Sequence, residues 1–284
     1  AGARVVKREA DLERQLESLE TLHEAVSAMK SLSAHHFRET RATLEPERAY
    51  REGIDRVARS TGAFLPAGSG AIGLLVLGPE LGLCGGYGTH VADMAASARE
   101  KLGAGPTFAV GRRGATMLTR RGLHIDRSYP APTSVRGITE ALLELSRAVL
   151  GDYIELGLSG FSVVSSRFGG VGNHPPVLTS LLPLDLVPQP GAPGLQYVTA
   201  KAANLVAARE LLYISIHGLL LDAMASEHSA RLLATQAAEE WLADETDHLR
   251  RGLSSARREA STQEVVEIAA GARARTNARA RAGS

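Results

Sequence analysis

The sequence predicts an α/β protein in which long N-terminal and C-terminal helices form an antiparallel coiled coil beside a central open-sheet domain. Three observations predict this class. Apolar residues recur every three or four positions in both end segments, the period of a helix with one apolar face. Between these segments, short apolar runs of strand length alternate with helical stretches. Finally, a helix of about 70 residues is roughly 105 Å long, too long for a domain of about 100 residues to contain, so a second helix must cover part of it.

The N-terminal segment has a single apolar stripe, with glutamates mostly between its members. The stripe consists of Leu12, Leu16, Leu19, Leu22, Val26, Met29 and Leu32. Pro46 interrupts the pattern, and it sits either in a kink or in the first turn of a second helix. Helical character then returns and stops at Gly62 and Pro66. We expect one long helix here, kinked or broken at Pro46.

In the middle of the chain, short apolar runs typical of strands alternate with segments that have the apolar period of a helix. The run Ile72–Leu77 is apolar apart from one glycine, which is typical of a strand buried on both faces. We expect further strands at 107–110 and 158–166, helices at 91–102, 115–121 and 138–150, and loop or edge structure at 169–193. Such alternation favours a small, Rossmann-like open sheet with helices on its faces.

The C-terminal segment from Lys201 to Ala270 contains no proline and repeats apolar residues, many of them alanine, mostly at spacings of three, four and seven. A seam rich in alanine lets a partner helix approach closely. The far end, residues 244–267, has a thin apolar stripe with charges on most sides, so we expect other proteins to contact it. We therefore divide the chain into an N-terminal coiled-coil helix (1–65), a central α/β domain (66–198) and a C-terminal coiled-coil helix with a basic tail (199–284).

Composition and charge exclude several classes of protein. Of the 284 residues, 44% are hydrophobic and 22% are charged, which is ordinary for a soluble globular protein. The net charge of +1 gives no overall field that would attract nucleic acid or an anionic membrane. The longest apolar run, Ile214–Ala225, contains His217 and Asp222 and is shorter than the ~18–20 residues of a bilayer span. We expect no direct insertion into a membrane.

Motifs that carry chemistry are weak in this sequence. The glycine-rich segment Gly82–Gly88 follows a predicted strand and precedes a predicted helix, the place of a phosphate-binding loop, but it lacks both standard glycine patterns. A tight structural turn is the default interpretation and a nucleotide site is the alternative. Cys84 is expected to be a small buried residue. His35 and His36 are adjacent rather than spaced for one helix face, so no metal is expected, and we expect no cofactor and no catalytic group.

One polar strip lies near the end of the C-terminal helix. Arg258 and Thr262 are four residues apart, as are Arg257 and Ser261, so guanidinium and hydroxyl donors share a helix face. Such a strip suits a partner that carries carboxylates. A merely solvated helix face explains the same residues equally well.

Several stretches, in order along most of the chain, resemble one family. The segments are Ala25 to Ala34, the Gly-Leu-Cys-Gly-Gly turn, Val110 to Gly114, Ala225 to Arg231 and Arg257 to Ala272. Together they are similar to the gamma subunit of F-type rotary ATP synthases, the central-stalk rotor. The chain departs from the family pattern at Glu80 and Gly88, and near the C-terminus at Ser254, Arg258, Glu259 and Ser261, which is typical of a divergent bacterial branch.

The resemblance implies a shaft that performs no bond chemistry. In that family the terminal helices form an asymmetric coiled coil inside a ring of three alpha and three beta subunits. The central domain lies outside this ring, near the epsilon subunit and the membrane c-ring. Rotation of the shaft couples ion flow to ATP synthesis or hydrolysis, at the cytoplasmic face of the bacterial plasma membrane.

The resemblance also implies two sets of subunit contacts. They are Met29 and Lys30, in a neck that faces catalytic-subunit loops, and Arg257, Arg258, Thr262 and Glu264, near a beta-subunit loop. Two other classes compete with the rotor interpretation. One is a Rossmann-like nucleotide-binding enzyme whose helices dimerise, and the other is a coiled-coil scaffold without a motor role. Binding of ATP or NAD by the purified chain discriminates the enzyme from the rotor.

Overall fold

The computed structural model describes residues 2–186 and 199–282, which fall into two compact units. Unit 1 comprises Ala1–Met29 and Thr235–Ser284, and unit 2 comprises Lys30–Ala234. Two long helices, α1 (Gly2–Thr61) and α5 (Ala200–Ala282), contribute to both units. The predicted helices at both ends of the chain are therefore confirmed.

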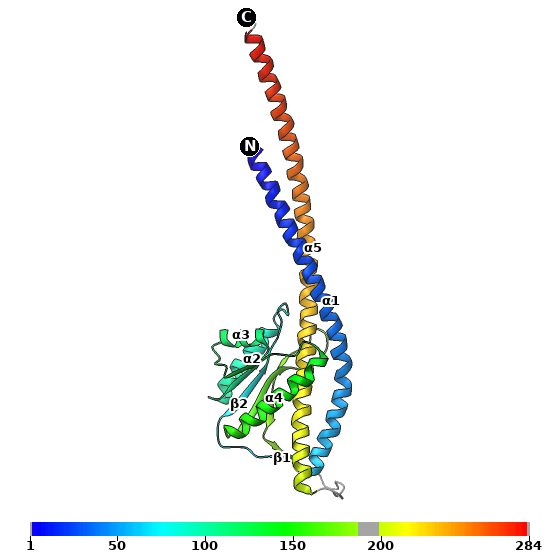
Figure 1. Cartoon of the computed structure of the whole chain (residues 1–284), viewed down its shortest axis with the longest axis vertical. Helices are drawn as coiled ribbons and strands as arrows, with labels where there is room; N and C mark the ends of the chain where they lie inside the picture. Colours follow the sequence, from blue (N-terminus) through cyan, green and yellow to red (C-terminus); the bar gives the residue numbers. More distant parts are fainter. Residues whose placement is uncertain (1, 187–198, 283–284) are drawn as a thin grey trace. The chain divides into compact units, whose positions relative to one another are not determined.

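In unit 1, α1 and α5 run antiparallel. Arg250 of α5 binds Glu20 of α1 at 3.0 Å, and Arg257, two turns later on α5, binds Glu13, two turns earlier on α1, at 2.6 Å. Residues that come later on one helix thus meet residues that come earlier on the other (Figure 1). The buried apolar residues of this unit are Val26, Leu242, Leu253 and Ala256. The antiparallel coiled coil expected from the apolar period is present here.

Unit 2 is built around a five-stranded sheet in the order β4-β3-β2-β5-β6. The strands are β2 (Ile72–Leu77), β3 (Thr107–Val110), β4 (Arg127–Tyr129), β5 (Gly160–Ser166) and β6 (Pro176–Leu182). All neighbouring strands pair in parallel except β6, which is antiparallel to β5 at the edge. A separate pair joins β1 (Phe64–Leu65) to β7 (Leu184–Asp185).

Helices cover both faces of this sheet because its strands alternate their side chains. Residues on one face of the strands, including Leu75, Phe108 and Phe161, pack against α4 (Val135–Glu155) and α5. Residues on the other face, including Leu74 and Ala109, pack against α2 (Tyr87–Leu102) and α3 (Arg112–Arg120). The predicted open sheet with helices on its faces is confirmed.

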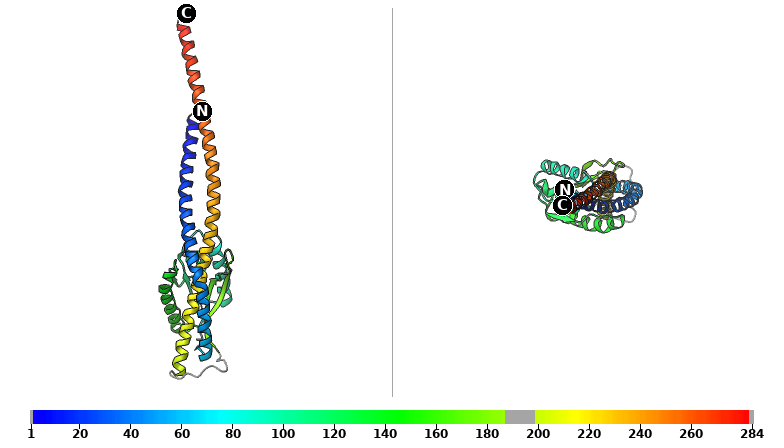
Figure 2. Two further views of the ribbon diagram at one scale, coloured as in Figure 1. Left: turned by 90° about the vertical axis from the view of Figure 1, so that its right-hand side faces the viewer. Right: turned by 90° about the horizontal axis from the view of Figure 1, so that it is seen from above.

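The middle of α5 belongs to the core of unit 2 as well as to the helix pair. Leu212, Ile216, Leu220 and Leu221 are buried against the sheet. On the side of α1, Arg48 binds Asp222 at 3.2 Å, and the two helices lie side by side there (Figure 1, Figure 2). By length and composition α5 contains a stretch apolar enough to cross a membrane, and half of that window is buried in this core. Buried core helices share this composition.

The structure refines the sequence-based expectations in three places. The helix α1 continues through Pro46, so the alternative in which Pro46 begins a second helix is wrong. Pro46 removes a single backbone donor, and the buried side chains of Leu44 and Glu47 hold the helix on either side of it. The strands β1 and β4 were not predicted, since two or three residues are too short for a visible period. The stretch 169–193, predicted as loop or edge structure, contains the edge strand β6, and its residues 187–193 lie outside the described part of the chain.

Candidate functional site

The residues singled out from the sequence lie in different surroundings. Met29 and Lys30 are both half-buried, Met29 at the end of its segment in unit 1 and Lys30 at the start of unit 2. Near the end of α5, Arg258, Thr262 and Glu264 are exposed. Their exposure agrees equally with a partner contact and with a solvated face.

Arg257 differs from its neighbours because it is engaged within the chain. Its guanidinium donates to Glu13 at 2.6 Å and to Glu9 at 3.1 Å, so it joins α5 to α1 inside unit 1. The hydrogen bond to Glu13, and to a lesser extent the one to Glu9, raises the pKa of Arg257. In contrast, the Nε of Arg258 donates to the carbonyl of Ser254 on its own helix. The predicted strip therefore divides into a residue that holds the coiled coil and residues that face solvent.

The sheet of unit 2 has a topological switch point between β2 and β5. The chain passes from β2 to β3 and β4 on one side and then returns to β5 on the other side of β2. In open α/β sheets, ligands bind in the crevice beyond the carboxyl ends of the strands at such a point. The loops after β2 and β5 border this crevice. A nucleotide-binding enzyme built on this sheet would need the crevice for its ligand.

Side chains of α5 fill that crevice. The Glu227 carboxylate accepts hydrogen bonds from the backbone N–H groups of Glu80 and Leu81, both at 3.3 Å, in the loop after β2. Arg231 donates to the carbonyl of Gly82 at 2.9 Å and also pairs with Glu227. The backbone donors that a phosphate group would use are thus bound to a carboxylate of the same chain.

The loop after β5 and the first turn of α2 also contact α5. The N–H of Gly172 donates to the Ser229 hydroxyl at 3.3 Å, and the buried Tyr87 hydroxyl donates to the carbonyl of Ala223 at 3.2 Å. His174 lies edge-on to the Tyr87 ring. We call the set of Glu80, Gly82, Glu227, His228 and Arg231 the α5 clasp. It joins α5 to the loop that the sequence left as either a turn or a nucleotide site.

A second buried carboxylate extends the clasp toward α3. Glu80 accepts the backbone N–H groups of Arg112 and Ala131, each at 3.0 Å, and its other oxygen pairs with the Arg112 side chain. Burial acts to raise the pKa of Glu80, but the N–H bonds from Ala131 and Arg112 and the guanidinium outweigh it, so the pKa falls. Glu80 is one of the positions where the chain departs from the family pattern.

Burial shifts the pKa values of the ionisable side chains in the clasp. Arg231 is only 1% exposed. Burial raises the pKa of Glu227, and Arg231 opposes that change. Burial lowers the pKa of His228 to about 3, assisted by Arg231 and by His36 of α1. His228 is therefore neutral at physiological pH, and its Nδ1 accepts a hydrogen bond from Arg231 at 3.2 Å.

The neutral state of His228 predicts acid sensitivity. In the unfolded chain a histidine takes up a proton near pH 6.5, whereas folded His228 resists protonation down to about pH 3. Because the unfolded state binds the extra proton, this residue lowers the free energy of unfolding as pH falls from 6.5, by about 2 kcal/mol at pH 5. We expect His228→Gln, which keeps an acceptor for Arg231, to flatten the loss between pH 6.5 and 5 in urea unfolding. The exposed His124→Gln is the control, and equal pH profiles for the two variants would contradict the assignment.

Cys84 lies beside the clasp and matches its sequence-based interpretation. It is buried, and burial followed by the Glu227 charge raises the pKa of its thiol. A thiol with a raised pKa carries less of the reactive thiolate. Cys84 is thus a small core residue within the glycine turn.

Comparisons with a family model and with named relatives point to the same family. The family model described as ATP synthase matches residues 8–274. Relatives named ATP synthase gamma chain from Lachnoclostridium phytofermentans and Desulforamulus reducens are 28% and 27% identical, over 93% of this chain and 98% of each relative. The chain belongs to the ATP synthase gamma family. The resemblance noted in the sequence is thereby confirmed over nearly its full length.

Solved structures show that the fold is shared with this family. A chain from the Euglena gracilis mitochondrial ATP synthase, in an OSCP/F1/c-ring assembly in rotational state 3, aligns with a TM-score of 0.67. The sequences are 13% identical, and the alignment covers 94% of both chains. A chain of the rotor of the same enzyme in rotational state 1 aligns with a TM-score of 0.62 at 12% identity, over 89% of this chain and 98% of that chain.

Sequence reasoning did not assign a role to the clasp. Its α5 residues lie in the segment Ala225 to Arg231, which carried part of the resemblance but no function. One signal was present: Glu227 and Arg231 are charged and one helical turn apart in a stretch whose other members, apart from His228, are alanine and serine. Charged residues are almost never fully buried unless paired, so such a pair in a core helix indicates a buried contact.

Proposed function

We propose that this chain is the central rotor shaft of an F-type ATP synthase, coupling ion flow through the membrane ring to ATP synthesis or hydrolysis. One observation carries the proposal: the same helix, α5, forms the coiled coil of unit 1 and is held by the clasp in unit 2. A shaft needs such a connection because torque applied to a loosely attached domain would be lost as local motion. The clasp attaches the α/β unit through buried charged groups.

The partners follow from the family and its named relatives. The relatives are gamma chains of ATP synthase, and the aligned Euglena gracilis chains come from F1 and c-ring assemblies. For this chain we propose three alpha and three beta subunits, an epsilon subunit and the membrane c-ring as partners. We place it at the cytoplasmic face of the bacterial plasma membrane, as a peripheral part of the complex. The three-part division at 1–65, 66–198 and 199–284 remains part of this proposal.

The enzyme alternative is disfavoured because side chains of α5 occupy the crevice at the switch point of the sheet, where a nucleotide would bind. A Rossmann-like enzyme binds its nucleotide through backbone N–H groups of the loop after the first strand. In this chain two of those groups donate to Glu227, and a buried guanidinium binds the next carbonyl of the loop. A phosphate would have to displace an internal carboxylate that is itself paired with Arg231. We therefore propose a non-catalytic subunit that binds no cofactor.

The test of the function uses the full chain in two settings. Alone, it is expected to hydrolyse no ATP and to bind neither ATP nor NAD by equilibrium dialysis. Assembled with alpha, beta and epsilon subunits from the same organism, and then with the membrane sector, it is expected to restore ATP-driven ion pumping. Turnover by the pure chain, or failure of the assembled complex to pump with all other subunits active, would overturn the rotor assignment.

For the exposed residues of the polar strip, we expect substitutions to change the activity of the assembled complex but not the stability of the free chain. We expect Arg258→Ala and Thr262→Ala to lower the ATPase rate of the assembled complex and to leave the unfolding midpoint of the free chain unchanged. Arg257→Ala instead removes the bonds to Glu9 and Glu13, so the first turns of α1 should exchange amide hydrogens faster.

A matched control exists on the same helix. The Nε of Arg251 donates to the carbonyl of Asp247, four residues before it, just as Arg258 donates to Ser254. Arg251→Ala therefore reproduces the loss of charge and of a local hydrogen bond outside the strip. If Arg258→Ala changes the ATPase rate no more than Arg251→Ala does, the strip is a solvated face.

A further inference from the structure

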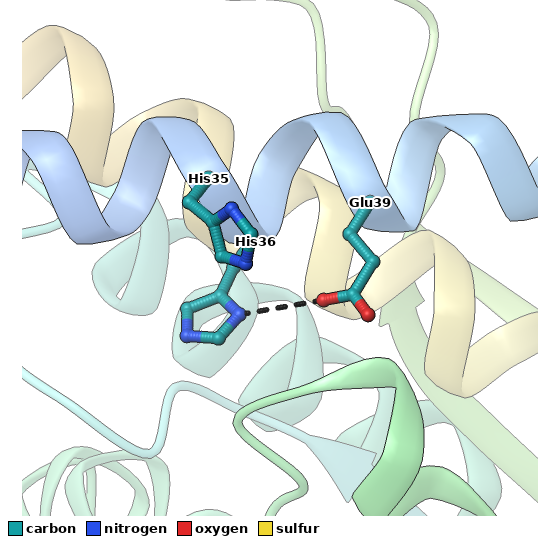
Figure 3. A group of neighbouring side chains, drawn as sticks. All are labelled: His35, His36 and Glu39. Atoms are coloured by element: carbon teal, nitrogen blue, oxygen red, sulfur yellow. Dashed lines mark ion pairs between the residues drawn. The ribbon is translucent and has the colours of Figure 1, made fainter.

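Three potential metal ligands meet on the surface of α1 within unit 2. His35, His36 and Glu39 each place one ligand atom within 4.8 Å of the others (Figure 3). Neither the clasp nor the proposed subunit contacts include these residues. Two imidazoles and one carboxylate form a donor set that proteins use for zinc.

Helical spacing explains why the three side chains converge. His35 and Glu39 are four residues apart, and His36 and Glu39 are three apart, so both imidazoles lie on the same side of the helix as the carboxylate. The sequence-based expectation of no metal rested on the adjacency of the two histidines, on the lack of a His-Glu-x-x-His motif and on the single cysteine, and it did not consider Glu39. Their rings meet edge to face, with centroids 5.4 Å apart, and Glu39 supplies the third ligand one turn later (Figure 3).

The His36 ring is held in place before any metal arrives. It stacks on His228 of α5, with ring centroids 5.3 Å apart and an interplanar angle of 26°. Its Nδ1 is buried and has no hydrogen-bond partner among the described residues. The nearest carboxylate oxygen, on Glu39, lies 3.7 Å away, too far for a hydrogen bond. A cation placed between this buried nitrogen and the Glu39 carboxylate would give both of them a partner.

We propose that His35, His36 and Glu39 bind one divalent transition-metal ion of the zinc class, with water completing the tetrahedron. Because the three ligand atoms lie within 4.8 Å of one another, a common centre lies no more than about 2.8 Å from each of them, so side-chain rotations that move each atom by under ~1 Å give bonds of about 2.0–2.2 Å. The exposed His35 and the partly exposed Glu39 leave the site open to solvent. Magnesium and calcium, which prefer oxygen ligands, do not suit two imidazoles.

The site also has a structural consequence inside unit 2. Because His36 stacks on His228, an ion that fixes His36 also fixes the contact between α1 and the α5 clasp. We therefore expect the metal to bind the folded state and to raise the free energy of unfolding with the logarithm of the free metal concentration once that concentration exceeds Kd. This inference does not depend on the proposed rotor function.

The test titrates Zn²⁺ into the purified full chain, followed by isothermal calorimetry and by metal analysis after dialysis. We expect one ion per chain. We also expect the affinity for Zn²⁺ to be at least ~10-fold weaker in His35→Gln and in Glu39→Gln, because losing even a residue that only hydrogen-bonds to a metal ligand typically costs ~10–100-fold in affinity. His124→Gln is the matched control, because His124 is an exposed imidazole 3.8 Å from the Asp126 carboxylate. Mg²⁺ in excess should not displace the ion.

Two further readouts separate a chelate from loose surface binding. X-ray absorption of the Zn²⁺-loaded chain should show two imidazole ligands, and circular dichroism should confirm that the variants remain folded. Thermal unfolding of wild-type protein should shift upward with Zn²⁺, whereas that of Glu39→Gln should not. Unchanged affinity in His35→Gln and Glu39→Gln, or an equal loss in His124→Gln, would overturn the proposal.

Discussion

Replacing Arg231 with methionine is expected to lower the free energy of unfolding by about 3–5 kcal/mol, because it leaves the buried Glu227 carboxylate without its charged partner. The substitution also removes the donor to the carbonyl of Gly82, so the glycine turn loses its attachment to α5. Urea unfolding of the full chain at pH 7 measures the loss. In the assembled complex the same variant should reduce the yield of coupled pumping.

Two comparisons make this prediction specific to the buried pair. The double variant Glu227→Gln with Arg231→Met removes both charges, so it should recover part of the stability that Arg231→Met loses. Arg48→Met breaks the pair with Asp222, in which Arg48 is half exposed, and should cost much less. If Arg231→Met is no more damaging than Arg48→Met, the clasp does not hold α5 as described.

Replacing Gly111 with alanine is expected to cost about 3 kcal/mol or more of unfolding free energy. Gly111 has φ +97°, a conformation that side chains disfavour, and a Cβ there would collide with the carbonyl oxygen of Gly78 and lie 2.7 Å from that of Pro79. The close approach occurs where the end of β2 meets the start of α3, and Gly111 N–H also donates to Tyr129 at 2.8 Å. Neither backbone can move without breaking sheet contacts.

A substitution at Gly122 separates the cost of the backbone conformation from the cost of the close contact. It has φ +80°, but among the described residues no heavy atom outside its immediate neighbours lies within 4 Å of a Cβ built on it. Gly122→Ala therefore carries the conformational penalty alone, about 1 kcal/mol. Thermal unfolding of both variants gives the comparison. Equal losses would show that the contact with Pro79 contributes nothing.

Much of the fold was predictable because it depends on local period. The strands Ile72–Leu77 and Thr107–Val110 have the bounds that the apolar runs predicted, and α1 and α5 follow from repeats of three and four. The clasp was not predictable, since Glu227 meets Leu81 across 146 residues and no local pattern reports such a contact. Arg257 was assigned to a partner because a helix face alone does not reveal Glu13 on the opposite helix.

The core role of α5 has a consequence for how the chain is made. The sheet strands β2 to β6 end at Leu182, but one face of the sheet is covered by α5 residues near 212–225. A ribosome adding about 5–20 residues per second takes roughly 2–9 s to make the intervening 43 residues. During that interval the nascent sheet presents an apolar face and backbone N–H groups that lack the Glu227 carboxylate to solvent. We therefore expect the sheet either to be protected by a holding chaperone or to fold only after the C-terminal helix has been made.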